Sequence, residues 1–552
     1  MLAPLAALAL ANEIQNPLPV MVSTLASVQA RLRADPPGGS ADAPYWLSYA
    51  VVEERRTTIQ GTHGVHAGTL READRTLDID VRVGSMALDN THKIRDASFF
   101  SGESRPSWNV PLRGPAEALR RALVRGTDDV YRQARARLVK VRANAAVKVE
   151  REDNSADFAP APVVSEEIEF GAEPVDIQAW EQLLAEASGR YIGREHVLDS
   201  AVQLVVSESR RWIVNSEGTR VRDGRQHYRL ATWAETVADD GMALTVYDYV
   251  DVASPSALPR RDGALALVDG VADRLLALRA APLVEPWSGP AILRGRAAGV
   301  FFHEIFGHRV EGHRQKDEDE GQTFTQKVGE GILPPFIDVI DDPLQARLAG
   351  EDLNGHYKVD DEGVRAQAVP LVEGGVLRNF LLSRSPVAGF PASNGHGRRQ
   401  PGNAVVARQG NLIVSARQSV SYEALRERLV AEVRAQKKEF GLVFDDISGG
   451  FTFTGRSTPN SFAVQPVTVW KVFADGRPDE LVRGVDLIGT PLATFGRIVA
   501  AADDVEVFNG VCGAESGWVP VSAASPSLLV SEVEVQRREK GNDRPPLLPV
   551  PR

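Results

Sequence analysis

The sequence feature that most constrains the fold is an apolar segment, AAGVFF at 297–302, that runs directly into His303 and Glu304. Its composition predicts a helix over about 297–311 that is largely buried in the protein interior. An unpaired buried carboxylate is energetically costly, so His303 and Glu304 need partners in such a helix. The chain must therefore fold so that a polar site forms inside its core, and a bound metal would satisfy both residues.

The residues around this helix are those that a zinc hydrolase uses: His303, Glu304 and, five positions after the first histidine, His308. Neutral imidazoles bind Zn²⁺ at about 2.0–2.1 Å. The metal lowers the pKa of a water molecule to about 7, and a neighbouring carboxylate can then accept its proton. The alternative is a helix whose polar residues are simply exposed or hydrogen-bonded, and the apolar lead-in argues against it.

The spacing of the two histidines needs a local distortion. On an ideal helix of about 3.6 residues per turn, a separation of five residues turns the second imidazole by roughly 140° from the first. Both imidazoles can reach one metal only if the helix bulges or ends between them, and a π-type bulge at Gly307 would have this effect. Spacing alone is thus a moderate indication of a metal site.

A third protein ligand must come from elsewhere, and two residues are candidates. His313 lies five residues after His308, in a place similar to that of the last ligand of the metzincins. Cys512, the single cysteine, is flanked by Gly510 and Gly513, as expected where the backbone packs closely against a site. A lone cysteine is more often an inert buried residue. Spacing does not choose between His313 and Cys512.

The two halves of the chain differ in their hydrophobic patterns. Helical patterns occur at about 21–33, 115–142, 180–188 and 271–281, with alternating strand-like segments such as 45–53 and 76–83 between them. A Pro- and Gly-rich stretch at 282–290 marks a boundary. Beyond it, Gly-punctuated β-like runs dominate, for example at 336–339, 412–414, 462–473 and 528–535.

We therefore predict an α+β fold with two domains. A mixed α/β domain would cover 12–285, and a β-rich, sandwich- or barrel-like domain that carries the HExxxH helix would cover 286–552. Hydrophobic residues at 43% and charged residues at 25% exclude disorder for the bulk of the chain.

Charge and hydropathy limit which ligands and which cellular location we expect for the chain. The net charge of −11, from 63 basic and 74 acidic residues, gives no reason to expect nucleic acid as the main ligand. No apolar run reaches the roughly 20 residues that span a bilayer. The run at 1–11, MLAPLAALALA, is similar to a secretory signal peptide without its basic region. Export to the periplasm is one expectation, and a cytoplasmic protein with an apolar tail is the other.

Several segments together resemble the TldD/PmbA (TldD/TldE) family of zinc metalloproteases, in its catalytic, TldD-like subunit. They are FFHEIFGHRVEGHR at 301–314, SNGHGRRQPG at 393–402, SGGFTFT at 448–454, TFGR at 494–497 and NGVCGAESGW at 509–518. The resemblance covers the second half well and the first half only in overall texture.

This resemblance implies roles for four residues. His303, His308 and Cys512 would hold one Zn²⁺ per chain, with Glu304 as the catalytic base. His313 then takes a supporting or surface position.

The chemistry of other side chains makes them candidates for a supporting role at the site. His396, Arg398 and Arg399 could stabilise an oxyanion or bind substrate, unless their Gly-rich loop is only an exposed turn. Glu311 could hold a ligand imidazole by a hydrogen bond, or form an ordinary salt bridge.

By the same resemblance, the expected activity is cleavage of peptides or unfolded polypeptides. A peptide aligned along a strand edge would be held by its backbone. The expected assembly is a homodimer or a heterodimer with a TldE/PmbA-like subunit. The alternatives are a non-catalytic peptide-binding scaffold with a structural metal, and a zinc amidase of another class.

Overall fold

A computed structural model describes residues 16–34, 43–94, 106–146, 153–452, 454, 462–489 and 494–538. The signal-peptide-like run at 1–11 lies outside these residues. Within them, no helix combines the length and the apolar character needed to cross a bilayer.

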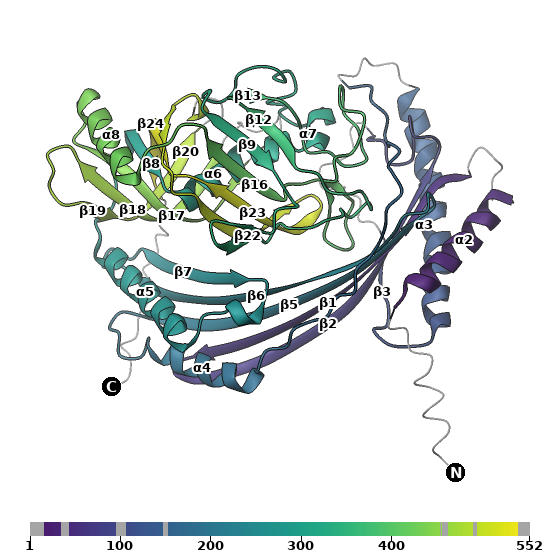
Figure 1. Ribbon diagram of the computed structural model, residues 1–552, viewed down its shortest axis with the longest axis horizontal. Coiled ribbons are helices and arrows are strands. Elements are labelled where there is room, and N and C mark those ends of the chain that lie inside the picture. Colours follow the sequence, from purple (N-terminus) through teal and green to yellow (C-terminus); the bar gives the residue numbers. More distant parts are fainter. Residues whose placement is uncertain are drawn as a thin grey trace, which may run out of the picture.

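The N-terminal half is built on one curved sheet of long antiparallel strands (Figure 1). The strand order is β3-β2-β1-β5-β6-β4, and β7 pairs with β6. The strands are β1 Pro44–Thr62, β2 Val65–Val83, β3 Ser107–Asn109, β4 Ser165–Glu167, β5 Asp199–Asn215, β6 Arg220–Val237 and β7 Ala243–Val252.

Two of these strands are about twice as long as the sequence pattern predicts. The segments predicted at 45–53 and 76–83 lie within β1 and β2, which have 19 residues each. The alternation in β1 breaks off at the exposed residues Glu54, Arg55 and Arg56. Because β2 and β5 pair with β1 on both sides through this region, backbone hydrogen bonds keep it extended despite its polar side chains.

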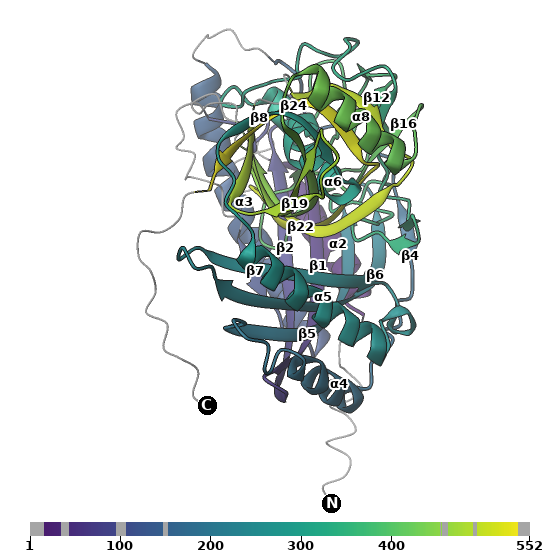
Figure 2. The same cartoon turned by 90° about the vertical axis from the view of Figure 1, so that its left-hand side faces the viewer.

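Helices cover the two ends of this sheet, as Figures 1 and 2 show. The helices α2 Leu18–Ala34 and α3 Ala116–Ala145 pack at one end, and α4 Ile177–Gly189 and α5 Arg261–Ala280 at the other. The Arg-rich helix α3 buries its stripe of apolar residues, including Leu119, Leu123 and Leu138, against the sheet. It is therefore an ordinary amphipathic helix with a solvated basic face.

The C-terminal half contains two larger sheets. The first has the order β13-β12-β9-β16-β23-β22, and the second β17-β8-β24-β20-β18-β19, with β21 also paired to β24. The strands of the first are β9 Ile337–Asp341, β12 Val369–Glu373, β13 Val376–Leu377, β16 Asn411–Ala416, β22 Glu506–Ala514 and β23 Gly517–Ser525. Those of the second are β8 Trp287–Leu293, β17 Phe440–Thr452, β18 Phe462–Phe473, β19 Glu480–Val482, β20 Val485–Gly489, β21 Ile498–Ala501 and β24 Leu528–Arg537.

Smaller elements complete this half. They are the helix α8 Tyr422–Ala435 and the two-stranded sheets of β10 Arg347–Leu348 with β11 Glu351–Asp352 and of β14 Gly397–Arg398 with β15 Val406–Ala407. The prediction of an α+β fold with a β-rich second half is confirmed.

A buried helix, α6 Gly295–Ile305, contacts strands of both sheets of the C-terminal half. Its Phe301 and Phe302 are fully buried and pack around Phe495. The burial inferred from AAGVFF is thus correct, and the helix anchors the site in the main core of this half.

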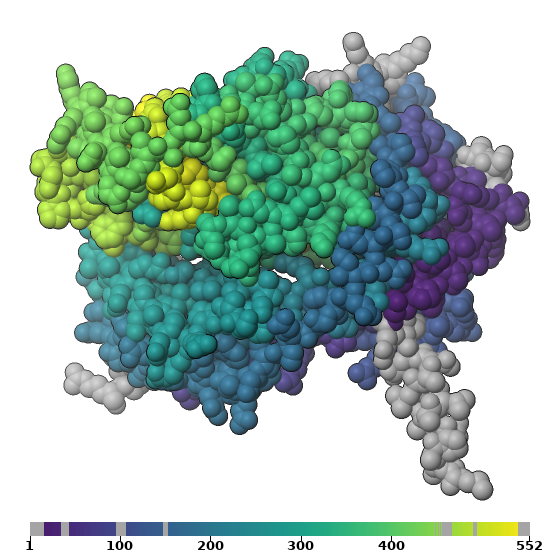
Figure 3. All heavy atoms as spheres, viewed as in Figure 1, coloured from purple at the N-terminus to yellow at the C-terminus, as the bar shows by residue number. Residues whose placement is uncertain are grey.

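The C-terminal half lies on the concave side of the long sheet, and a space-filling view shows a narrow opening between the two (Figures 1 and 3). Polar contacts join them across β5, β6 and β7. Arg211 bonds Asp361, and both Arg229 and Tyr249 donate to the carbonyl oxygen of Asn509 on β22.

Candidate metal centre

The histidine motif spans the end of one helix and the turn that follows it. Helix α6 carries His303 and Glu304 and ends at Ile305, and a 3₁₀ turn, η4 Gly307–Val310, carries His308. The single helix predicted over 297–311 is therefore wrong in its second part. The chain reaches the required geometry by a local helix end rather than by a π bulge.

Two contacts lie at this helix end. A Cβ atom on Gly307 would lie 1.8 Å from Oε1 of Gln409, so a larger residue here would have to displace the buried amide of Gln409. Arg309 Nη1 donates to the carbonyl oxygens of Glu304 and Ile305, at 3.3 and 3.0 Å. These carbonyls lie at the helix terminus, where no further turn of the helix could pair with them.

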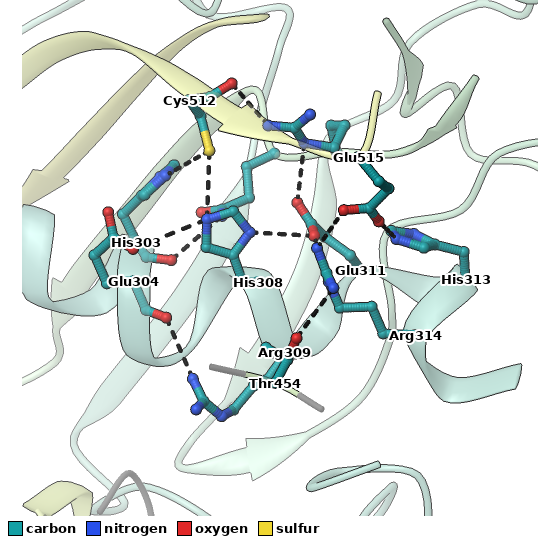
Figure 4. A network of polar contacts seen from close by, with 12 residues as sticks. His303, Glu304, His308, Arg309, Glu311, His313, Arg314, Thr454, Cys512 and Glu515 are labelled. Carbon is teal, nitrogen blue, oxygen red and sulfur yellow. Dashed lines mark hydrogen bonds and ion pairs between the residues drawn. The ribbon is translucent and has the colours of Figure 1, made fainter. Parts of the chain in front are cut away.

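The local helix end brings both imidazoles to one thiol (Figure 4). Cys512 Sγ lies 3.1 Å from His303 Nε2 and 3.3 Å from His308 Nε2, and the three ligand atoms lie within 4.8 Å of one another. The three residues are only 6–7% exposed. Strand β22, about two hundred residues later in the chain, supplies the thiol.

His313 lies outside this cluster. Its Nε2 bonds Glu515, and Figure 4 shows the two side chains turned toward each other beside the cluster. Glu515 also accepts a hydrogen bond of 2.8 Å from Arg314 Nη2. Cys512, not His313, is therefore the residue that the fold places with the two histidines.

The electrostatics of the cluster favour an ionised thiol. Burial raises the pKa of Cys512, but the adjacent His308 and His303 outweigh it and hold that pKa well below its usual range. Burial lowers the pKa of His308, yet the charges of Cys512 and Glu311 raise it well above its usual value. A thiolate is the form of cysteine that binds metals.

Glu311 orients one of the imidazoles. Its Oε2 lies 3.2 Å from His308 Nδ1 and accepts a hydrogen bond of 2.9 Å from Arg314 Nε. Burial raises the pKa of Glu311, but His308 and Arg314 outweigh this effect and lower it to about 2. Both alternatives considered for Glu311 hold at once, since it contacts the imidazole and forms a salt bridge.

Arg408 is a buried residue of this network that the sequence pattern does not identify. Its Nη2 donates to the carbonyl oxygen of Cys512 at 2.8 Å, and its Nε lies 3.4 Å from Glu311 Oε1. Its Nη1 donates to Ser516 Oγ at 2.8 Å. Arg408 has no motif around it, so no local signal in the sequence could have found it. Glu515, by contrast, lies within the segment 509–518 that carries the resemblance.

Glu304 lies on the metal-ligand side of His308. Its Oε2 is 4.0 Å from His308 Nε2, and its side chain keeps 13% of its surface exposed. A carboxylate in this position can reach both the cluster and a molecule that enters from solvent.

The candidates of the Gly-rich loop occupy a neighbouring buried network. His396 Nε2 lies 3.2 Å from Asp341 Oδ1, and both side chains are fully buried. Arg398 Nη1 donates to the carbonyl oxygen of Gln409 at 2.6 Å. Arg399 lies 3.2 Å from Asp78 Oδ2 on β2. The exposed-turn alternative is wrong, and in the contacts described none of the three touches a side chain of the cluster.

The cluster fits a zinc ion in its chemistry and its spacing. Two imidazoles and one thiolate are ligands that Zn²⁺ prefers. Nitrogen and sulfur ligands at about 2.0–2.1 and 2.3 Å in a tetrahedral site lie roughly 3.5 Å apart. The distances of 3.1 and 3.3 Å from Cys512 Sγ to the imidazoles are close to this value.

A His/His/Cys cluster with an adjacent carboxylate, set in the half that lies against the curved sheet, is a candidate metal centre. Residues 288–537 match the family model described as the PmbA/TldA metallopeptidase C-terminal domain. This match places residues 288–537 in the TldD/PmbA family.

Its relatives support this membership. A metalloprotease TldD homolog of Haemophilus influenzae is 29% identical over 250 residues, 45% of this chain and 48% of that protein. A metalloprotease of Methanothermobacter thermautotrophicus is 29% identical over 353 residues, 61% of this chain and 70% of that protein. The aligned segment thus spans about half of the Haemophilus relative.

The fold has a counterpart among solved structures. TldE from Thermococcus kodakarensis superposes with a TM-score of 0.60 at 13% identity and covers 94% of this chain and 100% of its own. At this identity the likeness concerns the fold.

Proposed function

We propose that this chain is a zinc-dependent metallopeptidase that cleaves peptides or unfolded polypeptides. The observation that carries the proposal is the convergence of His303 Nε2, His308 Nε2 and Cys512 Sγ beside the carboxylate of Glu304. The names of the relatives, which are metalloproteases, point to the same activity.

In this proposal the chain holds one zinc ion through His303, His308 and Cys512. The ion would supply Lewis-acid chemistry, polarising the scissile carbonyl and lowering the pKa of the attacking water. Glu304 accepts the proton of that water at its carboxylate and then donates it to the leaving amine. Glu311 keeps the His308 ring in the orientation that leaves Nε2 free for the metal.

The position of Cys512 favours an extended substrate. Strand β22 ends its sheet, so in the part of the chain that the structure describes one side of its backbone has no strand neighbour. Side chains already bond the carbonyl oxygens of Asn509, Gly510 and Cys512. A peptide aligned with this edge would therefore be held by the remaining backbone groups of β22, with little dependence on its sequence. The opening between the two halves would give such a peptide access (Figure 3).

The test combines metal content with cleavage. Plasma mass spectrometry of the purified chain should find about one zinc per chain, as a site with three protein ligands requires. Unfolded casein or long peptides should be cleaved, and chelation of zinc should stop the reaction. Glu304→Gln should keep the zinc and lose cleavage, because it removes only the base.

Other outcomes would select the alternatives. Cleavage that survives Glu304→Gln would exclude Glu304 as the base. A zinc-loaded chain that binds peptides without cleaving them would be a scaffold with a structural metal. Cleavage of small amides alone would indicate an amidase.

We also propose that the chain works as a dimer, either with itself or with a TldE/PmbA-like subunit. The likeness of the fold to TldE supports this proposal. Light scattering of the purified chain, alone and with a co-expressed TldE-like protein, would distinguish a homodimer from a heterodimer. A chain that stays monomeric and fully active would contradict both.

A further inference from the structure

The arginines that face the C-terminal half from the long sheet differ in their partners. Arg211 on β5 bonds the carboxylates of Asp223 and Asp361. Arg229 on β6 bonds Asp251 through two hydrogen bonds. Each of these guanidinium charges is therefore balanced by a carboxylate where the two halves of the molecule meet.

Arg225 is the exception in this row. It lies on β6 between Asp223 and Arg229, and residues at intervals of two on a strand share one face. Its Nη2 donates to the neutral Oδ1 of Asn354 at 2.6 Å, and within the described residues it forms no ion pair with a carboxylate. Burial and the charge of Arg398 lower the pKa of Arg225 to about 10.

Arg398 is a second guanidinium in the same situation. It is 7% exposed, stacks on the ring of Tyr357 at 4.7 Å and donates to the carbonyl oxygen of Gln409 at 2.6 Å. In the described part of the chain, no carboxylate lies within ion-pair distance of it. The charge of Asp251 acts on Arg225 and that of Asp361 on Arg398, but both carboxylates lie beyond ion-pair distance. Two guanidinium groups that lack a directly bonded carboxylate indicate a place for an anion.

The hydrogen-bond partners of both arginines bond backbone carbonyls at or near the cluster residues. Asn354, the partner of Arg225, donates from Nδ2 to the carbonyl oxygen of Gly510 at 2.8 Å, two residues before Cys512. Gln409, the partner of Arg398, donates from Nε2 to the carbonyl oxygen of His303 at 3.3 Å. The pair therefore lies beside the segments that supply two of the three cluster residues.

We propose that Arg225 and Arg398 form a carboxylate-binding subsite that holds an acidic group of the substrate next to the metal cluster. The group is a carboxylate, from an Asp or Glu side chain or from the C-terminus of the peptide. Guanidinium groups bind carboxylates through paired, charge-assisted hydrogen bonds. The proposal rests on the proposed function, because it specifies the substrates of that same site.

The test measures peptide binding rather than turnover. Zinc-loaded Glu304→Gln protein is titrated by calorimetry with three peptides of one length. The first is neutral and amidated, the second has a single Glu and an amidated end, and the third is neutral with a free C-terminus. A charge-assisted contact should make at least one carboxylate peptide bind about 10- to 100-fold more tightly than the neutral amidated one. The second and third peptides show which carboxylate is recognised.

Variants of the same protein assign the preference to Arg225. Arg225→Met should reduce the ratio between carboxylate and neutral peptides to about one, and Arg225→Lys should keep part of it. Arg220→Met is the matched control, since Arg220 is an exposed arginine on the same strand. It should keep the full ratio. Melting curves show whether each variant is folded. If Arg225→Met is unfolded, Arg225→Lys still tests the role of the guanidinium group.

Equal affinities for all three peptides would overturn the subsite. So would an Arg225→Met variant that weakens all three alike. These results are separable from a failure of the proposed function. Zinc-dependent cleavage of neutral and acidic peptides at equal rates would leave the peptidase intact and refute the subsite. A binding preference without any cleavage by the unmodified chain would refute the peptidase and leave the carboxylate subsite intact.

Discussion

Arg408 Nη2 donates a hydrogen bond of 2.8 Å to the carbonyl oxygen of Cys512, so a fully buried guanidinium holds the strand that supplies the thiol. The same side chain lies 3.4 Å from Glu311, which contacts His308. One residue thus connects the thiol on β22 to an imidazole on the 3₁₀ turn. The cluster is assembled from distant segments, and Arg408 fixes their relative position.

Replacement of Arg408 should weaken metal binding. Residues that orient metal ligands typically contribute about 10- to 100-fold to metal affinity. We expect Arg408→Lys to raise the zinc dissociation constant by about that factor, because lysine cannot reproduce the forked contacts. Cobalt substitution gives a readout besides activity, since the thiolate-to-cobalt absorption band should weaken. Arg417→Lys, at an exposed pair with Asp338, is the control and should bind zinc normally. An unchanged affinity in Arg408→Lys would contradict the role.

Glu311 should make the stability of the metal-free protein depend on pH. Its pKa of about 2 in the fold lies below the ordinary value of 4.5. A lowered carboxylate pKa stabilises the fold above pH 4.5, and this contribution disappears as the pH falls toward 2. The difference of about 2.5 between the pKa values corresponds to about 3 kcal/mol. Denaturant unfolding of the unmodified chain and of Glu311→Gln between pH 6 and 2 should give a flatter profile for the variant. Parallel pH profiles for the two proteins would contradict this role of Glu311.

The features that could be predicted from the sequence are local ones. The buried helix before His303 follows from AAGVFF, and the amphipathic α3 follows from its apolar stripe. The distortion between His303 and His308 follows from their spacing, although its form does not. Gln409, which fills the space beside Gly307 just after the helix end, is about a hundred residues away in sequence.

The features that could not be predicted depend on distant contacts. The full length of β1 depends on its pairing with β5, which no pattern in β1 itself reveals. Cys512 and His313 are equal candidates by spacing, and the tertiary fold separates them by directing His313 to Glu515. The carboxylate partners of Arg399 and His396 likewise come from other elements, so their loop looks exposed in the sequence and is buried in the fold.

His308 and His313 should differ in their effect on zinc. His308→Gln should lose most of the bound zinc, because it removes one of three ligand atoms. His313→Gln should keep about one zinc per chain, because His313 bonds Glu515 and not the cluster. Measurement of the zinc content of both variants after dialysis at pH 7 shows which histidine is a ligand. Loss of zinc from His313→Gln together with retention in His308→Gln would reverse the ligand assignment.

Oxidation of Cys512 should release the metal. Thiolates react with hydrogen peroxide to form sulfenic and then sulfinic acids, which changes the ligand. We expect peroxide to abolish cleavage in parallel with zinc release, which a chromogenic chelator can follow. Because the chain has one cysteine, mass spectrometry assigns the modification without ambiguity. Zinc bound in advance should slow the reaction, since the metal occupies the thiolate. Full activity in a chain whose Cys512 is oxidised would exclude it as a ligand.

Gly307 and Gln409 should be coupled, since the side chain of Gln409 occupies the space beside the backbone of Gly307. A Cβ atom at position 307 would lie 1.8 Å from Gln409 Oε1 and 2.2 Å from Gln409 Cδ. Gly307→Ala should therefore displace the 3₁₀ turn and His308, with a loss of stability of about 1–3 kcal/mol from overpacking and a lower zinc content. Gln409→Ala removes the obstructing atoms but also the hydrogen bond to the His303 carbonyl. If steric overlap is the cause, the double variant should be more stable and bind more zinc than Gly307→Ala alone. Additive losses in this double-mutant cycle would show that the two positions act independently.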